Sequence, residues 1–117
     1  MKVYILDRRG KTRDQIQMWL SDDKRLTGVE VFEDYIKFIE QIGNSPPDYC
    51  VIRLGWDGIP GLKTADMVRQ ISSDIKIIFI SDGRDYAVDA YEVGAYGYLL
   101  CPVKRVKLEK YLMKKEM

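Results

Sequence analysis

Short apolar runs alternate with amphipathic segments along the whole chain. The runs cover residues 3–6, 28–32, 49–54, 75–80 and 98–100. Their length, and the Gly, Pro, Asp and Ser residues around them, are typical of buried strands. Between the runs, apolar side chains recur at intervals of three and four residues, which indicates helices. The pattern therefore predicts five strands that alternate with five helices.

Several of the predicted helices carry start or stop signals. Thr12 and Gln15 have the spacing of a capping box, Asp34 suits an N-cap, and Gly43 suits the position after a helix. Three further helices are expected over residues 63–72, 85–93 and 104–115. The last of these is basic, and its predicted apolar side consists of Val106, Tyr111 and Leu112.

Regular alternation of strands and helices predicts an α/β fold with a parallel sheet. Five such units in about 120 residues favour a flavodoxin-like, doubly wound sheet of order 2-1-3-4-5. Ligands and reactive groups gather at the carboxyl ends of the strands in such sheets. The residues that follow the strands are Asp7, Arg8, Arg9, Arg53 to Asp57, Ser81, Asp82, Cys101 and Pro102.

Composition narrows the classes of function. The 117 residues fit one domain, residues 1–117, and the formal net charge of +1 gives no general reason to expect nucleic-acid or membrane binding. No apolar run has the length of a membrane span, and the first residues do not resemble a signal peptide, so we expect a cytoplasmic protein. The chain has no His, which excludes His-dependent triads and His-ligated zinc. Cys50 and Cys101 form no close-spaced metal motif and are expected to pack as small apolar residues.

Four segments resemble one known family. They are IIFIS at residues 77–81, YAVDAYEVGAYGYLL at residues 86–100, the pair Cys101-Pro102, and PDYCVIRLG at residues 47–55. Over nearly its whole length the chain resembles the receiver (CheY-like) domain of two-component response regulators. The segment at residues 86–100 is also similar to receivers attached to LytTR-type DNA-binding domains.

The resemblance implies that the phosphorylation site is degenerate. Receivers hold magnesium with an acidic pair after the first strand, where this chain has Asp7 and Arg8. Arg53 stands at the position of the phosphate-accepting aspartate, and Cys101 stands at the position of the lysine that contacts the phosphoryl group. A guanidinium is neither a nucleophile nor a metal ligand. The resemblance thus implies a pseudo-receiver that is not an enzyme and needs no metal or other cofactor.

Other parts of the receiver machinery are retained. Ser81 keeps the hydroxyl after the fourth strand, and Tyr98 keeps the aromatic residue of the signalling switch. The resemblance also implies a cis peptide bond before Pro102.

Electrostatics independently argues against magnesium at this site. Each cation at about 4 Å, with an effective dielectric constant near 20, would repel another unit charge by about 4 kcal/mol. Arg8 and Arg53 would therefore oppose metal binding, and Asp7 alone would not offset them. Arg53 either pairs with Asp7, extends its head group into solvent or contributes to an anion site.

We expect a phosphorylation-independent module that works through protein contacts in transcriptional regulation. Its recipient would be a DNA-binding output domain after Met117 or a separate protein, and the module itself is not expected to bind nucleic acid. A homodimer is expected through the last two helices and the last strand, because closed two-fold pairing is the commonest oligomer. The expected interface residues are Tyr86, Asp89, Tyr91 and Lys107, with Asp85 and Glu92 as further acidic partners of the basic last helix.

Two other functions remain open from the sequence. Arg8, Arg53 and Ser81 could form a pocket that senses a small anion or ligand. Alternatively, Asp57 or Asp82 could accept a phosphoryl group in place of the lost aspartate. Trp56 could either cap the core or serve as an exposed anchor for a partner.

Overall fold

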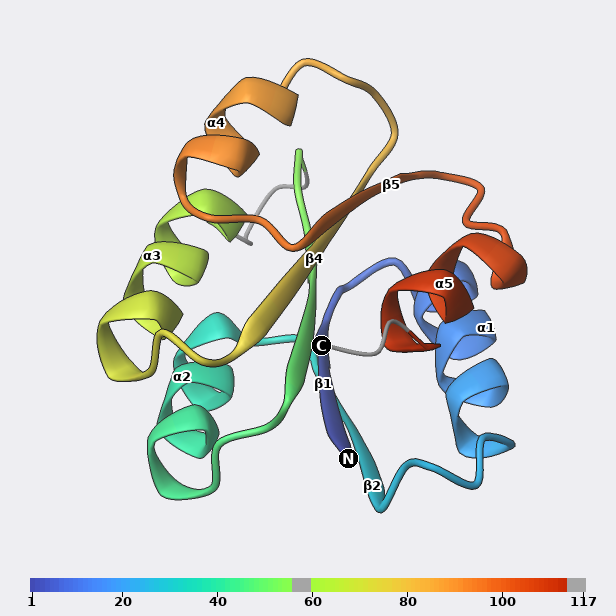
Figure 1. The fold of residues 1–117 in the computed structure, drawn as a ribbon. Helices are drawn as coiled ribbons and strands as arrows, with labels where there is room; N and C mark the ends of the chain where they lie inside the picture. The colour runs from blue at the N-terminus through green and yellow to red at the C-terminus, as the bar shows by residue number, and fades with distance from the viewer. Residues whose placement is uncertain (56–59, 114–117) are drawn as a thin grey trace.

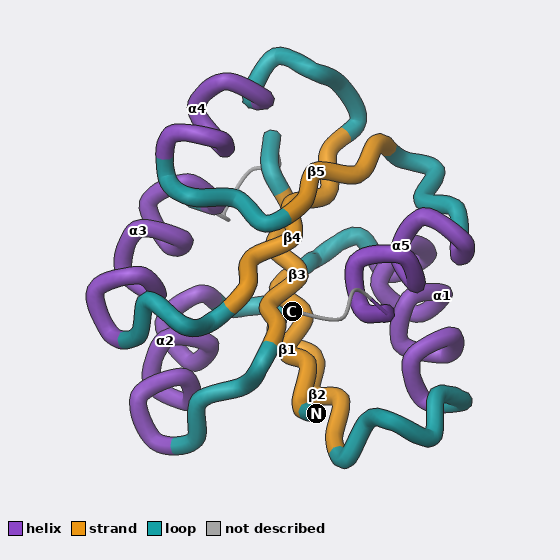
Figure 2. Tube along the Cα trace, viewed as in Figure 1, coloured by secondary structure: helices purple, strands orange, loops and turns teal. Residues whose placement is uncertain are grey.

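A single parallel sheet forms the centre of the molecule, which a computed structural model describes over residues 1–55 and 60–113. Its spatial order is β2-β1-β3-β4-β5, and every neighbouring pair is parallel. This order confirms the doubly wound topology predicted from the sequence (Figure 2). The strands are β1 (Lys2–Leu6), β2 (Gly28–Phe32), β3 (Tyr49–Arg53), β4 (Lys76–Ser81) and β5 (Gly97–Leu100).

Helices cover both faces of the sheet. Figure 1 shows three of them, α2, α3 and α4, on one side and the other two, α1 and α5, on the opposite side. No helix in the described part of the chain is long and apolar enough to cross a membrane. The helices are α1 (Gly10–Ser21), α2 (Tyr35–Asn44), α3 (Gly61–Ile71), α4 (Ala87–Glu92) and α5 (Arg105–Met113).

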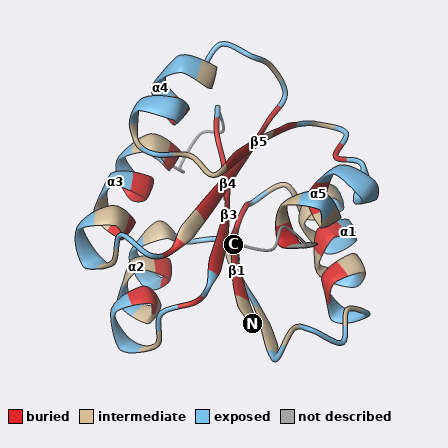
Figure 3. Ribbon diagram, in the orientation of Figure 1, coloured by how far each residue is buried: buried red, intermediate tan, exposed pale blue. Residues whose placement is uncertain are grey.

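The two layers of helices create two hydrophobic cores. Side chains alternate along a strand, so β3 sends Cys50 and Ile52 into the core under α2 and α3, and Val51 into the core under α1 and α5. All five residues of β3 are buried, as expected for a central strand (Figure 3). The charged side chain at the end of this strand, Arg53, is therefore held inside the protein.

Several predicted helix boundaries differ from the structure. The helix α3 covers Gly61–Ile71 instead of residues 63–72, and α4 covers Ala87–Glu92 instead of residues 85–93. The helix α1 begins at Gly10, so Thr12 lies inside its first turn and does not cap it. The turn starts earlier because the Asp7 carboxylate accepts a hydrogen bond from the backbone N–H of Arg9 at 2.9 Å. Gly43 is the penultimate residue of α2, whereas Asp34 caps that helix as predicted, accepting from the Ile36 N–H at 2.8 Å.

The buried side of α5 also differs from the prediction. Leu108 and Leu112 are buried against the sheet, whereas Val106 is 62% exposed. Residues four apart share a helix face, and a residue two positions before Leu108 points away from it. Gly97 lets this helix approach β5 closely, because a Cβ atom there would lie 2.7 Å from the ring of Tyr111.

Candidate functional site

The site lies at the carboxyl edge of the sheet, where β1 and β3 end side by side. Asp7 directly follows β1, and Arg53 is the last residue of β3. The two strands are hydrogen-bonded neighbours, with Leu6 in register with Ile52. The sheet order therefore brings the two charged side chains together although 46 positions separate them in the sequence.

Arg53 and Asp7 form a buried, bidentate ion pair. The Nε atom of Arg53 donates to Oδ1 of Asp7, and its Nη2 atom donates to Oδ2, each at 3.1 Å. The exposed fraction of the side chain is 1% for Arg53 and 0% for Asp7. The sequence left open whether Arg53 pairs with Asp7, extends into solvent or contributes to an anion site. In the structure it pairs with Asp7.

The third nitrogen of the guanidinium also has partners. Nη1 of Arg53 donates to the sulfur of Cys101 at 3.1 Å and lies 3.8 Å from Oδ1 of Asp82. Burial by itself lowers the pKa of Arg53, but hydrogen bonding and attraction to Asp7 outweigh it, so the net shift is upward. Arg53 therefore stays charged, with all three guanidinium nitrogens engaged.

Arg9 connects the ion pair to the end of β4. Its backbone N–H donates to Asp7, and its Nη1 atom lies 2.7 Å from Oδ1 of Asp82. The second cation beside Asp7 is thus Arg9, whereas Arg8, the cation expected from the sequence, is exposed. An aspartate side chain often accepts a hydrogen bond from the backbone N–H two residues later and so forms a turn. The spacing of Asp7 and Arg9 could therefore have indicated this turn.

Ser81 and Tyr98 both contact Gly83 in the loop after β4. The buried Ser81 hydroxyl accepts from the Gly83 N–H at 3.3 Å. The half-buried Tyr98 donates its hydroxyl to the Gly83 carbonyl at 2.5 Å. Residues of β4 and β5 thus both form hydrogen bonds to the same loop. Further along the chain, the peptide bond between Cys101 and Pro102 is cis.

Gly61 is a residue of the site that the sequence analysis missed. A Cβ atom at this first position of α3 would lie 2.5 Å from the carbonyl oxygen of Arg53. The close approach of α3 to the end of β3 therefore requires glycine. The sequence offered only a general turn signal, since Gly61 follows Pro60.

The donor atoms at this edge do not suit magnesium. Mg²⁺ prefers an octahedral set of oxygen ligands. Both carboxylate oxygens of Asp7 already accept hydrogen bonds from Arg53, and Oδ1 also accepts one from Arg9. Across residues 1–55 and 60–113, no group of three or more His, Cys, Asp or Glu residues could hold a metal ion. Trp56 and Asp57, which the sequence analysis considered, lie outside the described residues.

The two cysteines are free thiols that lie in different surroundings. Cys50 is fully buried, and this burial raises the pKa of its thiol. Cys101 is half-buried beside Arg53. No disulfide joins them. Cys50 packs in the core as expected, whereas Cys101 differs from the expectation because its sulfur accepts a hydrogen bond from Arg53.

The residues expected at an interface lie apart from the ion pair, on α4 and α5 around the edge strand β5. Tyr91 is 82% exposed, and Asp89 and Lys107 are also exposed. Tyr86 is 37% exposed and packs its ring near Gly55, whose φ of 74° suits glycine. The structure thus separates a buried charged site from an exposed surface.

Sequence and structure comparisons assign the family. The model of the response regulator receiver domain matches residues 3–113, and the chain belongs to this family. It is 22% identical over 116 residues to the transcriptional regulatory protein YpdB of Escherichia coli K12, covering 99% of this chain and 48% of that protein. It is 26% identical over 114 residues to the transcriptional regulatory protein BtsR of the same strain, covering 96% of this chain and 46% of that protein. The chain spans about half the length of these relatives.

Solved structures show the same fold. The response regulatory domain of protein mrkE from Klebsiella pneumoniae superposes with a TM-score of 0.85 at 20% identity, covering 96% of this chain and 92% of that chain. A response regulator from Chloroflexus aurantiacus gives a TM-score of 0.84 at 20% identity, covering 95% and 93%. These comparisons establish the flavodoxin-like architecture of the receiver family.

Proposed function

We propose that this chain is a pseudo-receiver, which signals without being phosphorylated. The observation that carries the proposal is the buried bidentate pair of Arg53 and Asp7. By resemblance, this pair stands where other receivers bind magnesium and accept the phosphoryl group. It supplies a fixed positive charge next to Asp7, the member of the expected acidic pair that this chain retains.

The chemistry of phosphorylation explains why this arrangement is unsuited to it. Transfer of a phosphoryl group to a carboxylate needs a nucleophilic oxygen and a cation that neutralises the phosphoryl charge. Arg53 offers no nucleophile, and Asp7 would have to give up its hydrogen bonds before it could bind metal. Asp82 is exposed and lies 2.7 Å from Arg9, so its carboxylate is also engaged.

The proposed recipient of the signal is a DNA-binding output domain. YpdB and BtsR are named transcriptional regulatory proteins, and the chain matches about half of each. The resemblance of residues 86–100 to LytTR-linked receivers supports the same role. The module itself would be neither an enzyme nor a DNA-binding domain, and it would work in the cytoplasm.

Dimerisation through the edge around β5 is the second part of the proposal. This edge exposes apolar side chains from α4, β5 and α5, with exposed fractions of 71% for Val88, 82% for Tyr91, 38% for Leu100 and 62% for Val106. Apolar anchors within a charged rim are typical of modest protein interfaces. A two-fold contact would place Lys107 of one subunit near acidic residues of α4 in the other, such as Asp89.

The alternative of an anion sensor built from Arg8, Arg53 and Ser81 has less support. All three guanidinium nitrogens of Arg53 already have partners, and Arg8 is exposed. An anion at this position would have to compete with Asp7 for Arg53. The geometry therefore favours the pseudo-receiver.

An NMR titration tests this function. Magnesium chloride and beryllofluoride, a mimic of an aspartyl phosphate, would be added to ¹⁵N-labelled protein. We expect no saturable shift of the amide signals of Asp7, Arg53 and Ser81. The control is the triple variant Arg8→Asp/Arg53→Asp/Cys101→Lys, which restores the groups typical of the family and should respond. Saturable shifts in the natural chain would contradict the proposal.

A further inference from the structure

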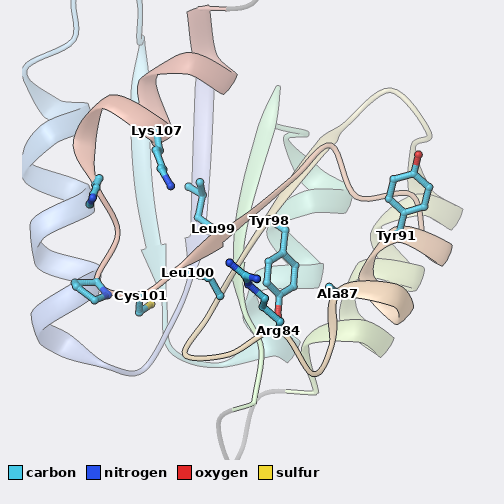
Figure 4. A pocket seen from close by; sticks show the side chains of 10 residues that line it. Arg84, Ala87, Tyr91, Tyr98, Leu99, Leu100, Cys101 and Lys107 are labelled. Atoms are coloured by element: carbon cyan, nitrogen blue, oxygen red, sulfur yellow. The ribbon is translucent and has the colours of Figure 1, made fainter.

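A cationic cavity lies at the edge around β5 and borders the Arg53 site through Cys101. Its volume is about 600 Å³, within the range of about 300–1,000 Å³ typical of small-molecule sites. Three cations from separate segments line it: Arg84 precedes α4, Lys104 precedes α5, and Lys107 is in the first turn of α5. Figure 4 shows Lys107 pointing from α5 toward β5, with Arg84 and Tyr98 on the side of α4.

These cations form no ion pair within the described part of the chain. None of the ion pairs between described residues involves Arg84, Lys104 or Lys107. The nearby Arg105 differs, because its Nε atom lies 2.7 Å from Glu109 on the same helix. Like charges around one cavity repel one another, and an anionic occupant would remove that repulsion.

The start of α5 adds to the positive potential. Lys104 occupies the position before the helix, where its carbonyl accepts from the N–H groups of Lys107 and Leu108 at 3.0 and 3.2 Å. The first turn contains no acidic residue. Helix N-termini are stabilised by negative charge, so lysines at this place are electrostatically unfavourable. The cavity therefore combines the positive end of a helix with three cations that form no ion pair with another described residue.

The rest of the lining suits a flat, partly apolar group. Tyr98, Leu100 and Tyr91 contribute to the walls, and no acidic side chain does. Tyrosine rings and an arginine guanidinium can stack on planar rings. A hollow that mixes such groups with cations suits a compact ligand.

We infer that this cavity binds a small molecule that joins at least two negative charges to a planar ring, the chemistry of a nucleoside diphosphate. Arg84, Lys104 and Lys107 bind the charges, and the ring packs against Tyr98 and Leu100. Binding of such a ligand at the exposed edge around β5 would regulate the module. The inference does not depend on whether Arg53 prevents phosphorylation.

Calorimetric titration with ADP tests the inference, without magnesium and at low salt. We expect saturable binding of one ADP per chain, weakened about fivefold by Arg84→Gln or by Lys104→Gln, because each removes one charge-assisted contact. Lys63→Gln, which removes an exposed cation from α3, is the matched control and should leave the affinity unchanged. Pyrophosphate should bind more weakly than ADP, because it lacks the ring.

Three results would overturn the inference. They are the absence of ADP binding at millimolar concentration, equal losses in Lys63→Gln and in the cavity variants, and equal affinities for pyrophosphate and ADP. If Arg84→Gln and Lys104→Gln changed only self-association, measured in parallel by sedimentation, the cavity would be a protein interface and the ligand assignment would be wrong.

Discussion

Arg53 and Asp7 face each other at the ends of β3 and β1, joined by two hydrogen bonds of 3.1 Å and shielded from solvent. The guanidinium places its charge where the family is expected to bind a metal ion. Other receivers bind the metal ion and the phosphoryl group reversibly, whereas here a side chain of the protein would replace them permanently.

Removing Asp7 should strongly destabilise the fold. The variant Asp7→Ala leaves the Arg53 charge buried without its partner, at an expected cost of about 3 kcal/mol or more in the free energy of unfolding. The control Asp22→Ala removes an exposed carboxylate and should change stability by less than about 0.5 kcal/mol. Urea unfolding measures both. Equal, small losses would mean that solvent screens the pair.

Replacing both partners should cost less than the sum of the single replacements. Arg53→Met leaves Asp7 buried without the guanidinium, and Asp7→Asn leaves Arg53 without its counter-ion. The double variant removes both charges, while Asn can still accept the hydrogen bond from the Arg9 N–H. A double-mutant cycle from urea unfolding should give a coupling free energy of about 1.5 kcal/mol or more. Additivity within about 0.5 kcal/mol would argue against a direct interaction.

The module should dimerise without phosphorylation. We expect association in roughly the micromolar range in sedimentation experiments at low salt. Raising the ionic strength should weaken it, as should Lys107→Glu or Asp89→Lys, because rim charges are screened by salt. Lys63→Glu on α3 is the control and should leave association unchanged. A monomer at high protein concentration and low salt would refute this interface.

The sequence predicted the architecture well because its signals are strong and local. Continuous apolar runs such as residues 75–80 identify buried strands, and the helical spacing between them identifies the helices. Helix boundaries differ from the prediction where tertiary contacts decide them. The turn made by Asp7 starts α1 before Thr12, and packing against the sheet selects Leu108 instead of Val106.

The candidate site was predictable only in part. Neighbouring strands and opposite charges suggested that Arg53 and Asp7 could meet, but the depth of burial decided between pairing and exposure. The role of Arg9 depends on the direction of a loop side chain, which periodicity does not specify. The cavity near Lys104 joins three segments through their packing, so no single stretch of sequence indicated it.

Phosphorylation of the intact protein tests the central claim most directly. The chain would be incubated with acetyl phosphate and magnesium and its mass measured, with the variant Arg53→Asp alongside. We predict no added phosphoryl group on the natural chain, because the ion pair of Arg53 and Asp7 occupies the positions where the family is expected to accept the phosphoryl group and bind the metal. Arg53→Asp alone should also remain unmodified, since Arg8 and Cys101 still differ from the family pattern. A stable phosphoryl group on an aspartate of the natural chain would contradict the account.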